Sequence, residues 1–313
     1  MNEKGFEGGV LLCCIGKNEN DYIREFVEHY LALGFSHIRI YDNNDPDGED
    51  FRDVIGDYVE SGFVDIVDYR GRARAQLPAY NDCARKLSPR YGWTAFFDCD
   101  EFLDLRGKYG SVSEWLGSIP NLENYDVIHV NWRCYDDNGL LRNDGRPLWE
   151  RFSTPRKPLD WQVRPEGGFP ENNHVKSIVR TTKTPSLWTE NAHTPTSESL
   201  KDRVCDWAGR PVENSPFRPY DFEAEDAVVL RHYCTKTISE YLEHKFRRGL
   251  PDRGPKMSAT VLTVDYFFAR NDRTPEKERV AEEFLAAHPL KKPGLLKRLW
   301  QWFAYRVLCR YVN

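Results

Sequence analysis

Val10-Leu-Leu-Cys-Cys-Ile15 decides the fold class of this 313-residue chain. The run is apolar throughout and of strand length, and polar Lys17-Asn18-Glu19 follows closely. A strand without polar alternation is typical of a parallel sheet that is covered on both faces. Residues 21–33 then carry apolar side chains at helical spacing, and Gly34 is placed to end a helix. The sequence therefore predicts a buried strand that leads through a polar loop into a helix.

The same pattern repeats along the first third of the chain. Strands are expected over 38–41, 64–69 and 93–97, and helices over 51–61 and 76–86. This β-α-β-α-β-α-β order, in units of about 25–30 residues, predicts an α/β fold with a mainly parallel central sheet and right-handed crossovers. Ligands of such sheets bind at the carboxyl ends of the strands, so that edge is the expected site.

The pattern is weaker after residue 105. Long loops are expected across 136–220, with these elements around them: strands over 129–132 and 228–232, and helices over 239–248 and 275–288. The length allows about two domains, or one α/β domain with insertions. The sequence has no G-x-G-x-x-G, no Walker A motif and no internal repeat, so dinucleotide-binding and P-loop functions lack support.

Charge is distributed unevenly along the chain. The formal net charge is −5, but residues 290–313 carry six Lys or Arg and no acidic side chain. The rest holds 38 basic and 49 acidic residues, a formal charge of −11. Nucleic-acid binding needs clustered Lys and Arg, so an acidic body argues against it.

Carboxylates follow three of the expected strands: Glu19, Asp42 and the run Asp98-Cys99-Asp100-Glu101. Along an extended segment, alternation points Asp98 and Asp100 to the same side, where both can reach one hard divalent cation. Such a metal commonly keeps open positions for phosphate oxygens. The alternative is that these acidic residues only solvate the end of a strand, because a D-x-D alone is a weak motif.

Several motifs together resemble the GT-A glycosyltransferases, and within them the bacterial group related to glycosyltransferase families 2 and 92. The matching segments are Cys14-Ile-Gly-Lys-Asn-Glu19, Tyr41-Asp-Asn-Asn44, Ala79-Tyr-Asn-Asp-Cys83, Phe97-Asp-Cys-Asp-Glu-Phe102, Val175-Lys-Ser-Ile-Val-Arg180, His232-Tyr-Cys-Thr-Lys236 and residues 245–249. The resemblance implies a GT-A domain over 1–250, with a nucleotide-binding half over 1–105 and an acceptor half over 106–250. A C-terminal helical extension would occupy 251–313.

The resemblance also implies a nucleotide-sugar donor, with a UDP-sugar expected, and Mn²⁺ or Mg²⁺ between its diphosphate and the D-x-D. Asp100 would be the principal metal ligand, and Asp98 would contact the ribose or the metal. Glu19 and Asp42 would surround the nucleoside. In physical terms, the cation offsets the charge that develops on the departing diphosphate.

Further side chains are candidates for contacts to the donor and the metal. Arg72, Arg74 and Lys176 are candidate phosphate contacts, although Arg72 and Arg74 fit ordinary surface charge equally well. GT-A enzymes often take an additional metal ligand from a histidine late in the domain. His232 is the first candidate for this role, and His193 is the alternative.

The acceptor side is less well defined. An inverting transfer needs a carboxylate that removes the proton of the acceptor hydroxyl, and Glu150 and Glu166 are the candidates. The related segment usually reads aromatic-Gly-Ser/Asn-Ser/Asn-Gly, whereas this chain has Tyr135-Asp-Asp-Asn-Gly139. Most tryptophans fill cores or rims, but sugar rings stack on such side chains, and the candidates are Trp132, Trp161 and Trp188.

The predicted function is a metal-dependent glycosyltransferase of the hexosyltransferase kind, inverting in outcome. It would move a sugar to a glycan or lipid-linked acceptor in polysaccharide biosynthesis. One alternative is a metal-dependent phosphoesterase or nucleotidyltransferase that uses the same carboxylates, although two-metal hydrolysis calls for more His and Asp ligands at close spacing. Another alternative is a non-catalytic module that binds a sugar or nucleotide.

The expected location is the cytoplasm, with possible contact to the inner face of the membrane. The eight cysteines form no CxxC motif and several lie in apolar strands, which favours a reducing compartment. The first nine residues do not resemble a signal peptide, and no apolar run reaches the length of a membrane span. Over 294–311, apolar and basic residues alternate as in an interfacial helix on an anionic membrane, or as in a terminal helix docked on the domain.

Overall fold

The computed structural model describes residues 8–156, 171–180, 188, 190–196, 200, 202–218, 227–246 and 263–288. Trp161, Glu166 and the tail 294–311 lie outside the described residues. The chain divides into two compact units, residues 1–272 and 273–313. In the second unit, helix α9 (Pro275–Ala287) begins after Thr274, whose side chain accepts a hydrogen bond from the Lys277 backbone N–H. This helix confirms the prediction for 275–288.

The first third of the chain folds as the predicted series of strands and helices. In order, these are β1 (Val10–Gly16), α1 (Asn20–Ala32), β2 (His37–Asp42), α2 (Arg52–Glu60), β3 (Val64–Asp68), α3 (Gln76–Lys86) and β4 (Trp93–Phe96). Strand β1 pairs in parallel with β2 and β4, and β2 pairs in parallel with β3. The predicted α/β class with a mainly parallel sheet is confirmed.

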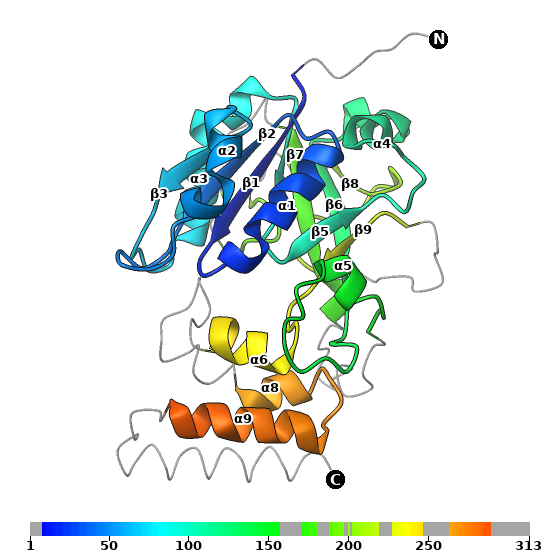
Figure 1. Ribbon diagram of the computed structural model, residues 1–313. Helices are drawn as coiled ribbons and strands as arrows, with labels where there is room; N and C mark the ends of the chain where they lie inside the picture. The colour runs from blue at the N-terminus through cyan, green and yellow to red at the C-terminus, as the bar shows by residue number, and fades with distance from the viewer. Residues whose placement is uncertain are drawn as a thin grey trace. The chain divides into compact units, whose positions relative to one another are not determined.

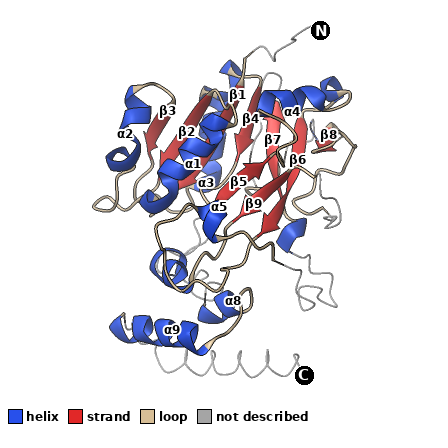
Figure 2. Ribbon diagram, turned by 45° about the vertical axis from the view of Figure 1, so that its right-hand side comes forward, coloured by secondary structure: helices blue, strands red, loops and turns tan. Residues whose placement is uncertain are grey.

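Strands from later in the chain extend this sheet (Figures 1 and 2). They are β5 (Glu101–Asp104), β6 (Val127–Cys134), β7 (Val175–Arg180), β8 (Val204–Asp206) and β9 (Val229–His232). The order is β3-β2-β1-β4-β7-β6-β9-β5, with β8 beside β6. Strand β7 runs antiparallel to β4 and β6, and β5 runs antiparallel to β9. Periodicity predicted β6 and β9 but not β5, which opens with the charged residue Glu101.

The remaining helical elements are short. They are α4 (Val112–Ser118), α5 (Leu148–Arg151), α6 (Ile238–Glu240), the π-helical η6 (Tyr241–Phe246), α8 (Val264–Phe268), and the 3₁₀ turns η1 (Ser88–Arg90), η2 (Leu122–Asn124) and η4 (Glu171–Asn173). Elements α6 and η6 occupy the region predicted as helix 239–248. Within the described ranges, no helix combines the length and the apolar character needed to cross a membrane.

Alternate side chains of β1 enter two different cores. Val10, Leu12 and Cys14 belong to the cluster that includes the buried face of α1, with Tyr22, Ile23 and Phe26. The intervening Leu11, Cys13 and Ile15 belong to the cluster that includes Ala79, Tyr80 and Cys83 of α3. Both faces of the strand are therefore dry, which explains its unbroken apolar sequence. The seven described cysteines are all buried and unpaired.

Candidate functional site

The D-x-D segment forms a turn between two strands. Strand β4 ends at Phe96 and β5 begins at Glu101, whose backbone N–H donates to the Asp98 carbonyl over 3.0 Å. The expectation that Asp98 and Asp100 alternate along an extended segment is therefore wrong, because the chain turns between the strands. The two carboxylates have different partners as a result.

Asp98 is held by hydrogen bonds and an ion pair. Its Oδ1 accepts from Gln76 Nε2 at 2.7 Å and from the Tyr80 hydroxyl at 3.0 Å, while its Oδ2 lies 2.9 Å from Lys176 Nζ. Lys176 is fully buried on β7 and also lies 3.6 Å from Glu101 Oε2. Burial on its own would lower the pKa of Lys176. The negative charges of Asp98 and Glu101 outweigh this effect, so the pKa lies above its ordinary value. Lys176 therefore remains a cation that neutralises buried acids, and a contact to phosphate stays a prediction.

Asp100 contacts two cationic or titratable side chains from the second half of the chain. Lys245 Nζ lies 3.0 Å from Asp100 Oδ2 and donates to the Cys234 carbonyl at 2.7 Å. His232 Nε2 lies 3.6 Å from Asp100 Oδ1. Burial alone would raise the pKa of Asp100, but Lys245 and His232 hold it well below its ordinary value. The carboxylate is therefore ionised at neutral pH.

Asp100 lines a pocket. Figure 1 shows the end of the sheet at which α1 begins, with α6 beyond it. The wall of the pocket consists of Glu19, Asp100, Cys234, Thr235, Lys236, Glu240, Tyr241, His244 and Lys245. These residues come from the loop after β1, the turn after β4, and the segment that runs from β9 through η6. Two acids of the wall are matched by two lysines, since Lys236 Nζ lies 3.8 Å from Glu19 Oε2. The structure thus brings the predicted residues Glu19, Asp100 and His232 into one region.

Asp42 binds an arginine that the sequence reasoning missed. Its buried Oδ2 lies 3.0 Å from Arg70 Nε and 2.9 Å from Arg70 Nη2. This pair ties the end of β2 to the loop after β3. Arg72 and Arg74 are exposed in the same loop, and the Arg72 guanidinium lies 4.1 Å from the centre of the Tyr69 ring. The roles of both arginines in phosphate binding stay predictions.

The two candidate histidines pack against the same tryptophan. The His232 and His193 rings lie 4.1 Å and 5.2 Å from the Trp132 ring. His193 Nδ1 lies 2.9 Å from the Val175 carbonyl, and burial lowers the pKa of His193 to about 3. His232 instead faces Asp100, which raises the pKa of His232 against the opposing effect of burial. Of the two, His232 is the better placed to act with Asp100.

Trp188 does not offer a face to a sugar ring. It is 1% exposed and packs against Tyr80 and Phe96, with ring centres 5.5 Å and 4.8 Å away. The expectation of a stacking role for Trp188 is therefore wrong, because its rings complete the core beside α3. Trp132 is half-buried and covered by histidine rings.

The candidate bases lie in different situations. Glu150 is exposed on α5, and Glu166 lies outside the described residues. In the segment 135–139, Asn138 and Gly139 both have left-handed backbones, with φ of 48° and 74°. A tight turn therefore takes the place of the expected acceptor segment, and the identity of the base stays a prediction.

A buried ion pair fixes the helix that carries part of the pocket wall. Arg151 Nη1 donates to both carboxylate oxygens of Glu240, at 2.8 Å and 3.0 Å. The Tyr22 hydroxyl donates to Glu240 Oε1 at 2.7 Å, and the Thr237 hydroxyl donates to Oε2 at 2.6 Å. Thr237 and Glu240 also form a capping box at the start of α6. Glu240 therefore joins α1, α5 and α6.

Asp100 and His232 fit a divalent cation better than Asp98 does. Asp100 Oδ1 and His232 Nε2 are 3.6 Å apart, close enough for both atoms to contact one ion. Both oxygens of Asp98 already have donors, so Asp98 would have to exchange Gln76 or Lys176 for a metal. An ion on Asp100 Oδ2 would in turn release Lys245.

Sequence reasoning missed several side chains of the pocket. Lys236 and Lys245 lie in the segments 232–236 and 245–249 that carry the family resemblance, which was the available signal. Glu240 and Arg151 had no such signal, because their pairing joins residues 89 positions apart. Neither spacing nor composition predicts a contact of that kind.

Buried histidines make the fold sensitive to acid. Burial lowers the pKa of His29 to about 4 and those of His129 and His193 to about 3. The unfolded chain binds these protons near pH 6.5, so the free energy of unfolding should fall as the pH drops below 6.5, by up to about 1.4 kcal/mol per pH unit for each histidine. Urea unfolding between pH 7 and pH 5 measures this slope. His129→Leu should reduce the slope, and an equal slope in the variant would contradict the assignment to His129.

The chain is similar to plant proteins over part of their length. The sequence model of the family described as Glycosyltransferase family 92 matches residues 9–243. Galactan beta-1,4-galactosyltransferase GALS2 of Arabidopsis thaliana is 25% identical over 175 residues, which cover 50% of this chain and 33% of the plant protein. A glycosyltransferase family 92 protein of Ricinus communis is 28% identical over 96 residues, 31% of this chain and 17% of that protein. The chain thus spans about a third or less of the length of these relatives.

Solved structures share a remote similarity with the chain. The structure of S. aureus TarS 1-349 in complex with UDP is 10% identical, with a TM-score of 0.37, and the match covers 90% of this chain and 71% of that one. The mannosyltransferase PcManGT from Pyrobaculum calidifontis, in complex with GDP-Man and Mn2+, is 16% identical, with a TM-score of 0.30, and the match covers 96% and 80%.

Proposed function

This chain belongs to glycosyltransferase family 92, and on that basis we propose that it is a hexosyltransferase with a nucleotide-diphosphate sugar as donor. A UDP-sugar is the proposed donor, and a glycan or lipid-linked sugar is the proposed acceptor. The observation that carries the proposal is the pocket around Asp100, in which an ionised, buried carboxylate meets cationic side chains at the end of the sheet. The carboxyl ends of the parallel strands β1 and β4 lead into this pocket, as in other α/β sheets that bind ligands.

The charges of the pocket suit a diphosphate and a cation together. Asp100 and Glu19 supply negative charge for a metal or for nucleoside hydroxyls, and Lys245 and Lys236 balance them while the donor is absent. A cation on Asp100 would free Lys245, whose ammonium could then contact a phosphate oxygen. The donor and its metal would therefore replace the ion pairs between these lysines and acids.

We propose that Mn²⁺ or Mg²⁺ is held by Asp100, with His232 within reach. When bound, this cation would neutralise charge on the departing diphosphate. Asp98, with Gln76, Tyr80 and Lys176, would keep the turn that carries Asp100 in place. Asp42 would lie beside the nucleoside. Its ion pair with Arg70 would hold the loop that carries the exposed Arg72 and Arg74 next to the donor.

The remaining parts of the proposal concern the acceptor and the location. Inversion at the anomeric carbon, with Glu150 or Glu166 as base, fits a single displacement on the face opposite the diphosphate.

We further propose a role in polysaccharide biosynthesis in the cytoplasm, with the basic tail 294–311 in contact with the inner face of the membrane. Deletion of 293–313 should then abolish binding to anionic vesicles.

Thermal unfolding with UDP and Mn²⁺ tests the donor site. We expect the two together to raise the Tm by several degrees, because ligand at about 100 times its Kd adds roughly 2.7 kcal/mol to the folded state. Either one alone should raise it much less, since each completes the other's binding site. Uridine with Mn²⁺ is the matched control, because it lacks the diphosphate.

The outcomes separate the proposal from its alternatives. Transfer of sugar to an acceptor, or slow hydrolysis of the sugar from UDP, identifies a glycosyltransferase. Hydrolysis of the diphosphate itself would identify a phosphoesterase instead. No change in Tm with any nucleoside diphosphate and metal would overturn the proposed donor site.

A further inference from the structure

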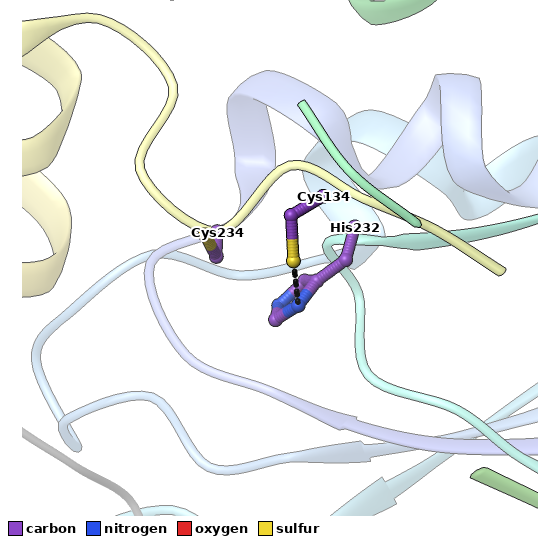
Figure 3. A group of neighbouring side chains, drawn as sticks. All are labelled: Cys134, His232 and Cys234. Carbon is purple, nitrogen blue, oxygen red and sulfur yellow. Dashed lines mark hydrogen bonds between the residues drawn. The ribbon is translucent and has the colours of Figure 1, made fainter. Parts of the chain in front are cut away.

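Two cysteines and a histidine converge beside the donor pocket (Figure 3). Cys134, His232 and Cys234 each offer one ligand atom, and the three atoms lie within 4.8 Å of one another. All three residues are buried. Among the residues that the structure describes, these three form the group of at least three His, Cys, Asp or Glu side chains that is compact enough to hold a metal ion.

The fold brings these residues together through strand pairing. Cys134 is the last residue of β6, His232 is the last residue of β9, and the two are partners in the register of this parallel pair. Tyr233 is buried among aromatic rings of the core, while Cys234 returns to the side of His232. The sheet therefore fixes two ligands, and the chain beyond β9 adds the third.

The two nitrogens of His232 face different groups. Nδ1 lies 4.0 Å from Cys134 Sγ, and Nε2 lies 3.6 Å from Asp100 Oδ1. A histidine that binds a metal through one nitrogen commonly donates its other N–H to a carboxylate, which orients the ring. Asp100 stands where such a carboxylate is needed. Tetrahedral zinc with Zn–S of about 2.3 Å and Zn–N of about 2.0 Å would need the S···N gap to close by roughly half an ångström.

The surrounding charge also suits a site of this type. Both terminal nitrogens of Arg156 lie 3.7 Å from Cys234 Sγ, which favours the thiolate form of Cys234. Arg156 is itself paired with Glu171 over 2.6 Å. Two thiolates would neutralise one Zn²⁺, so the bound complex itself would add no net charge to this buried region.

We propose that Cys134 Sγ, Cys234 Sγ and His232 Nδ1 bind one zinc ion, with water as the fourth ligand. On binding, the two thiol protons leave to solvent and the imidazole stays neutral, with its Nε2–H donating to Asp100. The zinc ion links β6 to the segment after β9 that carries Lys236. With zinc on Nδ1, His232 would orient Asp100 through its Nε2–H, and this role would replace His232 as a ligand of the donor's cation.

Cobalt substitution tests the site by a property that does not depend on activity. The full chain, stripped of metal and kept reduced, is titrated with Co²⁺. We expect one equivalent to give a thiolate-to-cobalt charge-transfer band in the near ultraviolet and the visible bands of tetrahedral cobalt. Zinc should displace the cobalt and abolish both. Cobalt on Asp100 alone has oxygen ligands and would give no thiolate band.

Variants identify the ligands. Cys134→Ala and Cys234→Ala should each lose the charge-transfer band, while Cys205→Ala, which removes an equally buried cysteine of β8, should keep it. Asp100→Asn should keep the band but weaken cobalt binding about 10- to 100-fold, as loss of a carboxylate behind a ligating histidine does. If the variants fail to fold, alkylation of the wild-type chain with iodoacetamide identifies the ligands instead. Zinc should slow the alkylation of Cys134 and Cys234.

Absence of the band from the wild-type chain would overturn the proposal, as would its persistence in both ligand variants. A disulfide between Cys134 and Cys234 in the protein as isolated, before any reductant is added, would overturn it as well. The two proposals can fail separately in the wild-type chain. A chain that gives no cobalt band can still be stabilised by UDP and Mn²⁺, and a chain that gives the band can lack that stabilisation.

Discussion

Asp100→Asn should lower turnover of the nucleotide sugar at least about 100-fold, equivalent to roughly 2.7 kcal/mol of transition-state stabilisation. The reason is that Asp100 is the ionised carboxylate that the proposed cation requires, and an amide oxygen binds a divalent cation much more weakly. The measurement is the initial rate of sugar release or transfer, with the donor chosen from a panel of nucleotide sugars. The joint stabilisation by UDP and Mn²⁺ should disappear in the same variant.

The matched control for this experiment is Asp104→Asn. Asp104 lies at the end of β5 and pairs with Arg231 over 2.7 Å, and it is absent from the pocket wall. The Asp104→Asn variant shows how much turnover falls when an ion-paired aspartate near the site is lost and the proposed metal ligand is kept. Near-equal turnover in wild-type and Asp100→Asn chains, with both folded by circular dichroism, would refute the role of Asp100.

Arg151→Met should reduce the free energy of unfolding by about 3 kcal/mol, because it leaves the Glu240 carboxylate buried without its cation. The Arg151 and Glu240 side chains are 2% and 4% exposed, so water cannot replace the lost partner. Tyr22 and Thr237 still donate to Glu240, which keeps the loss at the lower end of the range for broken buried pairs. Urea denaturation followed by circular dichroism measures the change.

A double-mutant cycle separates the ion pair from the rest of the contacts. With Glu240→Gln in place, Arg151→Met should cost much less, because no buried charge is left unpaired. Arg146→Met removes an arginine of the loop before α5 whose pair with Asp144 is exposed, and it should leave stability nearly unchanged. Equal losses from Arg151→Met in the wild-type and Glu240→Gln backgrounds would contradict the argument.

The first third of the fold could be predicted from sequence because its signals are local. The apolar run of β1 and the periodicity of α1 and α3 each depend on neighbouring residues, and these elements appear within a residue or two of the expected bounds. The turn at Asp98 to Asp100 was missed because an extended continuation and a turn have the same composition. Only the pairing of β5 with β9 determines that the chain must turn there.

The pocket around Asp100 could be predicted in part. Glu19 and Asp100 follow strands, so topology places them at one edge of the sheet. Lys245 and Arg151 depend instead on where long loops return, and hydrophobic periodicity carries no information about that. For Trp188 the prediction named a residue that does not belong to the pocket. From sequence alone, a tryptophan fits a sugar-binding face and a core equally well.

The contact between Tyr22 and Glu240 joins residues 218 positions apart and holds a residue of the pocket wall against α1. During synthesis, β1 to β4 leave the ribosome long before Glu240 does, and their parallel pairs all lie within residues 10–96. We therefore expect β1 to β4 and their helices to fold first and the pocket wall to assemble last. Nascent chains that stop before residue 232 would hold Asp100 without His232 or Lys245, so the capacity to bind the donor should arise only near the end of translation.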